Sequence, residues 1–221
     1  MSKAEILGNI RRGLRRGEPT EAQRSVVYNR LNAKANNLVP KRAQLPHDEQ
    51  VSLFKEMALE AAAELIELNS EAEVPQAVAD WLKANQIAEL VSASDAELNA
   101  LDWSPLGEIK RVERVAQAGD MASLTTTFAG IAETGTLMLH SRGESPTTLN
   151  FLPDIHLAVL RRSTIVGPYE DAWKKIREKF GSTLPRTVNM VTGPSRSADI
   201  EQKLQMGAHG PRTLVILLIN D

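Results

Sequence analysis

Short apolar runs alternate along this chain with segments in which apolar residues recur every three or four positions. The first pattern is typical of buried strands, and the second is typical of helices that pack one face on a sheet. Their alternation predicts an α/β fold with a layered, largely parallel sheet flanked by helices. Helices are predicted at residues 2–16, 47–64, 74–85, 96–101 and 169–180, and strands at 65–68, 88–92, 112–115, 125–127, 137–139, 155–160, 164–166, 187–191 and 214–219.

Several boundaries have a local chemical signal. The run Leu214–Ile219 is continuously apolar, as expected of a strand buried on both faces. A further short helix is predicted after Ser145, with that serine as N-cap and Pro146 at the first helical position. Residues 17–46 are polar, rich in asparagine and interrupted by prolines, which predicts a loosely structured connector.

Length and charge suggest two parts. The 221 residues, 42% of them hydrophobic, are enough for one substantial core. We therefore predict a basic helical arm and connector over residues 1–46 and one α/β domain over residues 47–221. Residues 1–46 carry ten Lys or Arg and three Glu, a net +7, which leaves 16 basic and 25 acidic residues, a net -9, in the remainder.

The basic arm raises the question of partners. Nucleic acid is not expected, because Tyr28 is the only aromatic residue of the arm and stacking surfaces are missing. Docking onto the acidic body, onto a second copy in a possible homo-oligomer, or onto a partner subunit is favoured instead. No apolar run approaches the roughly 20 residues of a membrane span, and the N-terminus lacks a secretory signal, so a cytoplasmic location is expected.

The chain contains no cysteine. It cannot supply thiolate ligands to an iron–sulfur cluster, form a disulfide or use a cysteine nucleophile.

One candidate ligand site is the segment around Glu133. Gly130 precedes the glutamate, and the turn Thr134-Gly135-Thr136 follows it. Glycine turns expose backbone N–H groups that can hold an anion. On spacing alone, the segment favours a tight hairpin with a solvated glutamate. The predicted helix start and strand that follow it shift the balance toward a ligand site.

A second candidate turn follows the strand predicted at residues 187–191. It contains Thr192, Gly193, Ser195, Arg196 and Asp199, and a short helix is predicted at residues 200–204. Arg196 could bind a phosphate or carboxylate through its planar fork. The alternative is an ordinary strand-to-helix turn in which Ser195 or Ser197 caps the helix.

A third turn, with His209 and Gly210, lies a few residues downstream. We predict that Glu133, Arg196 and His209 converge at one edge of the sheet to hold an anionic small molecule, with Glu133 and His209 as the candidates for site chemistry.

Cofactor and metal signals are weak. Neither a Gly-Lys-Ser/Thr phosphate loop nor a GxGxxG fingerprint occurs, so the cofactor stays unknown. A metal site can be sketched from Glu133, His140, Asp154 and His156, but no HxH or HExxH spacing is present. A hydrogen-bonded structural role is favoured for the two histidines, and no metal is predicted.

The segments GIAETGTL, SPTTLNFLPDIHLAVL and TGPSRSADIEQKLQMGAHGP resemble, in this order, the LUD-domain family. The resemblance covers most of the chain from about Gln50 onward. It implies a fold like that of the NagB/RpiA/CoA-transferase group and a role in L-lactate utilization, the oxidation of L-lactate to pyruvate, with iron–sulfur proteins as partners. It also makes Glu133 similar in position to the glutamate that attacks an acyl thioester in class I CoA transferases.

Three functions stay open at this point, and whether the chain is an enzyme is uncertain. The first is a non-redox subunit that binds an anionic metabolite or cofactor for its partner oxidoreductases. The second is a CoA-transferase-like or isomerase-like enzyme that uses Glu133. The third is a scaffold or regulator in which the glycine turns are only structural.

Overall fold

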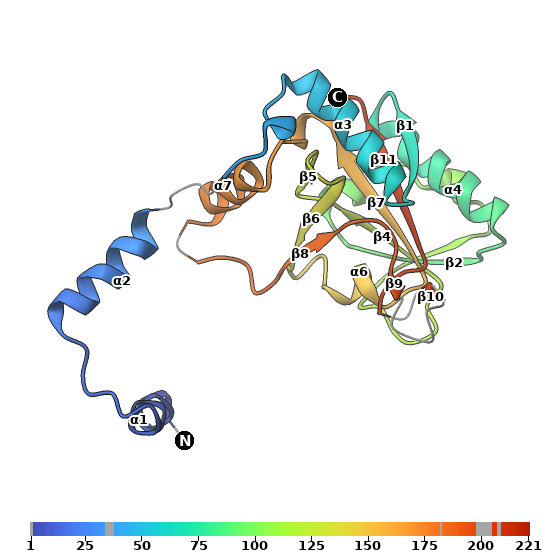
Figure 1. Cartoon of the computed structure of the whole chain (residues 1–221). Helices are drawn as coiled ribbons and strands as arrows, with labels where there is room; N and C mark the ends of the chain where they lie inside the picture. Colours follow the sequence, from blue (N-terminus) through green and yellow to red (C-terminus); the bar gives the residue numbers. More distant parts are fainter. Residues whose placement is uncertain (1, 34–37, 182, 198–204, 207–208) are drawn as a thin grey trace. The chain divides into compact units, whose positions relative to one another are not determined.

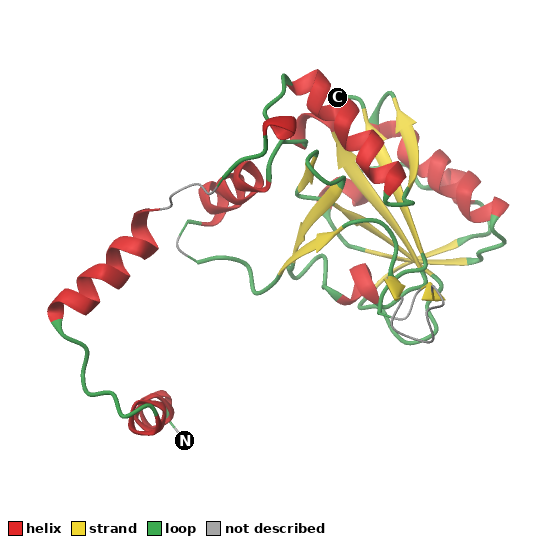
Figure 2. Ribbon diagram, in the orientation of Figure 1, coloured by secondary structure: helices red, strands yellow, loops and turns green. Residues whose placement is uncertain are grey.

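The computed structural model describes residues 2–33, 38–181, 183–197, 205–206 and 209–221, and these separate into two compact units. The small unit, Met1–Leu38, contains helices α1 (Lys3–Gly13) and α2 (Glu21–Ala33). The large unit, Val39–Asp221, contains the sheets and the remaining helices (Figures 1 and 2). The predicted division at residues 46 and 47 stays a prediction.

Helix α2 corrects the expectation of a loose connector over residues 17–46. Thr20 and Gln23 bond reciprocally, each side chain accepting the backbone N–H of the other, at 3.3 and 3.0 Å. This capping box satisfies helix-end donors, and the Glu, Ala, Gln, Arg and Leu residues that follow favour a helix. In α1, Ser2 and Glu5 form the same arrangement, and Ser2 is the N-cap of that helix.

The large unit is built on a six-stranded sheet in the order β1-β11-β7-β4-β2-β3. All of its pairings are parallel, which confirms the predicted sheet. Its strands are β1 (Glu64–Leu68), β2 (Glu89–Ser92), β3 (Lys110–Glu113), β4 (Ala122–Thr126), β7 (Ile155–Arg161) and β11 (Thr213–Ile219). The carboxyl ends of these strands therefore share one edge, which we call the carboxyl edge, and their starts share the amino edge.

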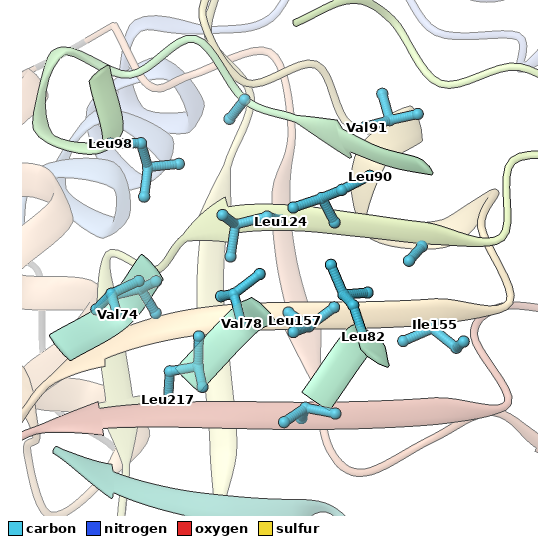
Figure 3. Packing of buried hydrophobic residues seen from close by; sticks show 14 of the residues in the cluster. Val74, Val78, Leu82, Leu90, Val91, Leu98, Leu124, Ile155, Leu157 and Leu217 are labelled. Carbon is cyan, nitrogen blue, oxygen red and sulfur yellow. The ribbon is translucent and has the colours of Figure 1, made fainter. Parts of the chain in front are cut away.

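Helix α4 (Val74–Ala84) covers one face of this sheet. Figure 3 shows its Val74, Val78 and Leu82 packed on Leu124, Leu157 and Leu217 of three neighbouring strands. The alternate residues of β11, Leu214, Ile216 and Leu218, are buried on the opposite face. The strand is thus buried on both faces, as its apolar run predicts.

The opposite face packs against helix α3 (His47–Glu60) and part of a second, antiparallel sheet. That sheet has the order β5-β6-β8, with β5 at Ala129–Ile131, β6 at Thr136–His140 and β8 at Val188–Val191. Helix α7 (Tyr169–Phe180) packs on it through a separate apolar cluster that includes Ala172 and Ile176. The predicted helix over 169–180 is confirmed at both ends.

Two predicted elements are wrong in detail. Residues 162–164 form a 3-10 turn, and Val166 makes only an isolated bridge to Ile131, so no strand forms at residues 164–166. Ser145 does not cap a helix, because its backbone pairs in both directions with Arg142 and its side chain is buried in that loop. The helix there, α6, is shorter and begins later, at Thr148–Phe151.

The remaining short elements connect these layers. They are η1 (Lys41–Ala43), η2 (Glu71–Glu73), α5 (Ala96–Asn99), η3 (Ser104–Leu106), η4 (Arg162–Thr164), β9 (Arg196–Ser197) and β10 (Gln205–Met206). No helix within the described residues is both long and apolar enough to cross a bilayer.

Candidate functional site at the carboxyl edge

A cavity of about 460 Å³ lies at the carboxyl edge of the parallel sheet. Thr126 at the end of β4 and Arg161 at the end of β7 line it, together with Asp95, which follows β2. His140 at the end of β6 and Lys179 near the end of α7 complete the wall on the side of the antiparallel sheet. Ligands of open parallel sheets bind at this edge, since loops from several strands converge there.

Arg142 is held rigidly in the wall of this pocket. Its Nε donates to Oδ1 of Asp95 at 2.8 Å, and its Nη2 donates to Oδ2 at 2.6 Å. Nη2 also donates to the Thr126 hydroxyl at 2.7 Å, and that hydroxyl donates to Asp95 Oδ2 at 2.8 Å. The two hydrogen bonds to Asp95 neutralise the charge of Arg142. The guanidinium therefore holds the pocket wall in place and is not available as a cation for a ligand.

Arg161 is neutralised in a similar way. Its guanidinium donates to Glu97 at 2.9 Å and also bonds Glu71, and Asp221 lies 4.0 Å away. The pKa of Arg161 is raised, first by the hydrogen bond to Glu71. With more than one carboxylate around it, Arg161 adds little positive potential to the cavity.

Lys179 is different. Its ammonium nitrogen lies 5.3 Å from the ring centre of Phe128 and 5.5 Å from that of Phe180, which are cation–π distances. No carboxylate among the described residues forms an ion pair with it. Lys179 is therefore the lining cation whose charge is available to a ligand.

His140 lies edge-on to the same two rings, with ring centres 5.6 Å from Phe128 and 4.9 Å from Phe180. Burial is the main cause of its lowered pKa, and the nearby Arg142 adds to the effect. The imidazole is consequently neutral at pH 7 and can donate or accept a hydrogen bond in the pocket.

The predicted turn around Glu133 and the predicted turn around Arg196 meet outside the lining of the carboxyl-edge pocket, where their threonine hydroxyls contact one another. Thr136 Oγ1 lies 2.6 Å from Thr134, 2.8 Å from the Tyr169 phenol and 2.6 Å from Thr192, and Thr134 lies 2.8 Å from Tyr169. Four hydroxyls therefore share four contacts, which use all four protons if each contact is one hydrogen bond. In that arrangement the cluster can accept hydrogen bonds from a ligand but has no spare donor for an anion.

The glycines of both turns fit against helix α3. Gly135 has φ +64°, and a Cβ there would overlap the backbone nitrogen of Ala58; Gly193 has φ +65°, and a Cβ there would overlap the carbonyl of Ala61. Arg196 Nη2 donates to that same carbonyl at 2.6 Å. Gly130 is likewise enclosed by Phe54, Leu160 and Ile165. These contacts give the glycines and Arg196 a packing and capping role.

The third turn joins the second through Ser195. The His209 N–H donates to Ser195 Oγ at 3.2 Å, the Ser195 N–H donates to the Pro211 carbonyl at 2.8 Å, and Gly210 lies beside the same serine. The structure thus links Thr134 to Thr192 through the Thr136 hydroxyl, and it joins Ser195 directly to His209. Asp199 and the helix predicted at residues 200–204 fall outside the described residues.

Glu133 remains the least constrained of the predicted residues. Its backbone N–H donates to the Gly167 carbonyl at 3.1 Å, but its half-buried carboxylate has no hydrogen bond or ion pair to another described residue. Within the described part of the chain, no direct bond links Glu133, Arg196 and His209. Their convergence on one anion therefore stays a prediction.

His156 has a structural environment. It is fully buried, its Nε2 lies 2.8 Å from the Thr125 hydroxyl, and burial lowers its pKa to about 4. Across the residues that the structure describes, no three His, Asp or Glu side chains gather closely enough to hold a metal ion.

The sequence reasoning missed most of the pocket. Asp95, Arg142 and Lys179 stand in segments with no recognisable motif, and His140 was interpreted as structural. One usable signal was available: Asp95 and Arg161 each follow a predicted strand within a few residues, which places both at the carboxyl edge of a parallel sheet.

Comparisons with known proteins fit this architecture. The model of the LUD domain family matches residues 51–219. A crystal structure of a DUF162 family protein from Deinococcus radiodurans superimposes with a TM-score of 0.60 at 23% identity, covering 79% of this chain and 99% of that one. This likeness shows a shared fold.

Sequence relatives extend over different shares of the chain. Uncharacterized protein YkgG of Escherichia coli is 29% identical, covering 100% of this chain and 99% of its own length. Lactate utilization protein C of Macrococcus caseolyticus is 25% identical, covering 100% of this chain and 96% of its own length. Lactate utilization protein C of Geobacillus thermodenitrificans is 37% identical over 108 residues, which cover 47% of this chain and 45% of its own length.

Proposed function

We propose that this chain, which belongs to the LUD domain family, is a cytoplasmic component of L-lactate utilization that binds a small carboxylate anion in the carboxyl-edge pocket. The relatives named lactate utilization protein C support the metabolic role. In this proposal the electrons of lactate oxidation pass through iron–sulfur partner proteins, as the resemblance to the LUD-domain family implies. The chain itself has no cysteine with which to hold a cluster.

The observation that carries the proposal is the free charge of Lys179. The two lining arginines are ion-paired, whereas the Lys179 ammonium contacts aromatic rings and no described carboxylate. One available cation suits one carboxylate, such as that of lactate or pyruvate. The hydroxyls of Thr127 and Thr164 donate to backbone carbonyls and keep lone pairs for a hydroxyl group of the ligand.

The carboxyl-edge pocket is larger than a three-carbon acid requires. About 460 Å³ lies within the range of pockets for larger small molecules, roughly 300–1,000 Å³. A three-carbon acid would leave part of this space empty, so the pocket has room for a larger anionic metabolite or for a cofactor beside the acid.

Isothermal titration calorimetry of the full chain with L-lactate and with pyruvate tests this proposal. Lys179→Met should weaken binding of the better ligand by about tenfold or more, since a tenfold change requires only about 1.4 kcal/mol. Lys174→Met, on the same helix but outside the pocket lining, is the matched control and should bind as the unaltered chain does. Equal affinities of the two variants would contradict the proposed site.

A second candidate function is acyl transfer at Glu133. The specific observation in its favour is the carboxylate without a hydrogen-bonding partner among the described residues, since a nucleophile needs an unengaged lone pair. The Glu133 oxygen would attack an acyl thioester carbonyl, forming a mixed anhydride as the C–S bond breaks and the thiolate leaves. Glu133→Gln should abolish acyl exchange with a CoA thioester while leaving the thermal midpoint unchanged; retained exchange would remove Glu133 from this role.

A further inference from the structure

Four buried polar side-chain atoms in the large unit have no hydrogen-bonding partner among the described residues. One of them, Arg111 Nε, belongs to a guanidinium that donates to Asn99 through another of its nitrogens. The other three are Oδ1 of Asn150, Nδ1 of His156 and Nδ2 of Asn189. Asn150 is only 2% exposed and His156 is 0% exposed. Because an unpaired buried polar atom is costly, each of these three calls for a partner.

His156 faces the space between the parallel and the antiparallel sheet. Leu157 of β7 packs in the core under α4, whereas Ala158 and Leu160 pack in the core between the two sheets. Because side chains alternate along a strand, His156 lies on the same face as Ala158 and Leu160. Its Nε2 lies 2.8 Å from the Thr125 hydroxyl. The other ring nitrogen, Nδ1, is therefore the one that needs a partner in this space.

Asn189 faces the same space from β8. It is the direct partner of Leu139 in the pairing of β6 with β8, and Leu139 packs in the core between the two sheets. Directly paired residues of an antiparallel ladder have their side chains on the same face. Val191, two residues further along β8, packs against that core as well. The Asn189 amide is therefore directed from the antiparallel sheet toward the parallel sheet.

Helix α6, which carries Asn150, covers the same face of the parallel sheet. Ser123 of β4 is the register partner of His156 and shares its face. The Ser123 hydroxyl donates to the Leu149 carbonyl of α6 at 2.6 Å. This bond holds the helix directly beside the strand position of His156.

A second contact sets the direction of the Asn150 side chain. The Thr147 hydroxyl at the start of α6 lies 2.8 Å from the hydroxyl of Thr187, the residue before β8. Asn150 follows Thr147 by three residues, so both lie on one side of the helix. Asn189 follows Thr187 by two residues, so both lie on one side of the extended chain. Asn150 and Asn189 therefore face each other across the space that His156 enters from below.

We propose that Asn150, His156 and Asn189 form a binding site for one water molecule between the two sheets, which we call the interlayer polar site. The water accepts a hydrogen bond from Asn189 Nδ2, donates one to Asn150 Oδ1, and forms a third with His156 Nδ1 in either tautomer. Three hydrogen bonds are usual for a buried water. Water is also neutral, like these three side chains, and small enough for a closely packed interior. None of the three residues lines the carboxyl-edge pocket, so this inference stands independently of the proposed function.

A double-mutant cycle in chemical denaturation tests whether one molecule links the two amides. Asn150→Leu and Asn189→Leu should each lower the denaturation midpoint, and the double variant should lose less than the sum of the two, because either change alone already breaks the bridge. Asn85, exposed at the end of α4 on the opposite face of the sheet, provides the control. The losses of Asn150→Leu and Asn85→Leu should add. Additive losses in both pairs would overturn the proposal.

A crystal structure of the unaltered full chain, at a resolution that shows ordered water, tests the site even where a leucine variant does not fold. One water is expected within hydrogen-bonding distance, about 2.7–3.2 Å, of Asn150 Oδ1, His156 Nδ1 and Asn189 Nδ2. Direct bonds among the three side chains, or three atoms too far apart to share one water, would overturn the proposal.

Discussion

Asp95 and Arg142 lie 47 residues apart in the chain and form a two-bond ion pair, with Nε–Oδ1 at 2.8 Å and Nη2–Oδ2 at 2.6 Å. Asp95 follows a strand of the parallel sheet, and Arg142 follows β6 of the antiparallel sheet. The pair therefore ties together the two walls of the carboxyl-edge pocket. Through the Thr126 hydroxyl it also includes the end of β4.

Asp95→Asn should destabilise the fold by about 3 kcal/mol, because removing one partner of a largely buried ion pair leaves the other charge uncompensated. Chemical denaturation of the variant measures this loss. Glu67→Gln is the matched control, since it breaks the exposed pair of Glu67 with Lys55. Exposed pairs contribute up to about 1 kcal/mol, so equal losses in the two variants would show that the Asp95 pair has no special role.

Because His156 is buried in its neutral form, the free energy of unfolding should fall in mild acid. Burial lowers its pKa to about 4 in the folded chain, whereas an unfolded histidine has a pKa of about 6.5. Between these values the unfolded state binds a proton that the folded state does not, so the contribution of His156 is present above pH 6.5 and is lost as the pH falls toward 4. From pH 7 to pH 5 the loss should be about 2 kcal/mol.

The measurement is the free energy of unfolding at pH 7 and pH 5 for the unaltered chain, His156→Gln and His47→Gln. The His156 variant should lose less stability between the two pH values, whatever its stability at pH 7. The exposed His47 serves as the control and should leave the difference unchanged. A pH dependence identical in all three chains would show that His156 is not the titrating group.

Gly135 is required by packing against α3. Gly135→Ala should cost more than about 2 kcal/mol, because the added methyl group meets the backbone of Ala58 and the residue must keep a positive φ. Gly119→Ala is the matched control, since Gly119 also has positive φ (+96°) but faces open space. It should show only the conformational cost, on the order of 1–2 kcal/mol, in thermal denaturation. Equal losses would argue against the close contact with Ala58.

The layers of the fold could be predicted from the sequence because each depends on local patterns. The apolar run at Leu214–Ile219, the helical spacing in α4 and the glycine after α7 are all readable within a few residues. Helix α2 was missed because its polar composition concealed the Thr20 and Gln23 capping box, which is also a local signal.

The site was harder to predict because its parts are distant in sequence. Gly135 and Gly193 have the positive φ that a ligand-binding turn uses, yet each is explained by a close approach to α3. Arg142 and Lys179 have ordinary neighbours in sequence, and only the folded contacts show which cation is paired and which is available. Pairing across two sheets is a property of tertiary structure, which no local pattern records.

A crystal structure of the full chain with L-lactate or pyruvate bound would show whether Lys179 holds the ligand. The carboxylate should lie in the carboxyl-edge pocket, within about 4 Å of Lys179 Nζ, the limit for an ion pair. A carboxylate bound instead beside Glu133, Arg196 or His209, with the carboxyl-edge pocket empty, would contradict this prediction.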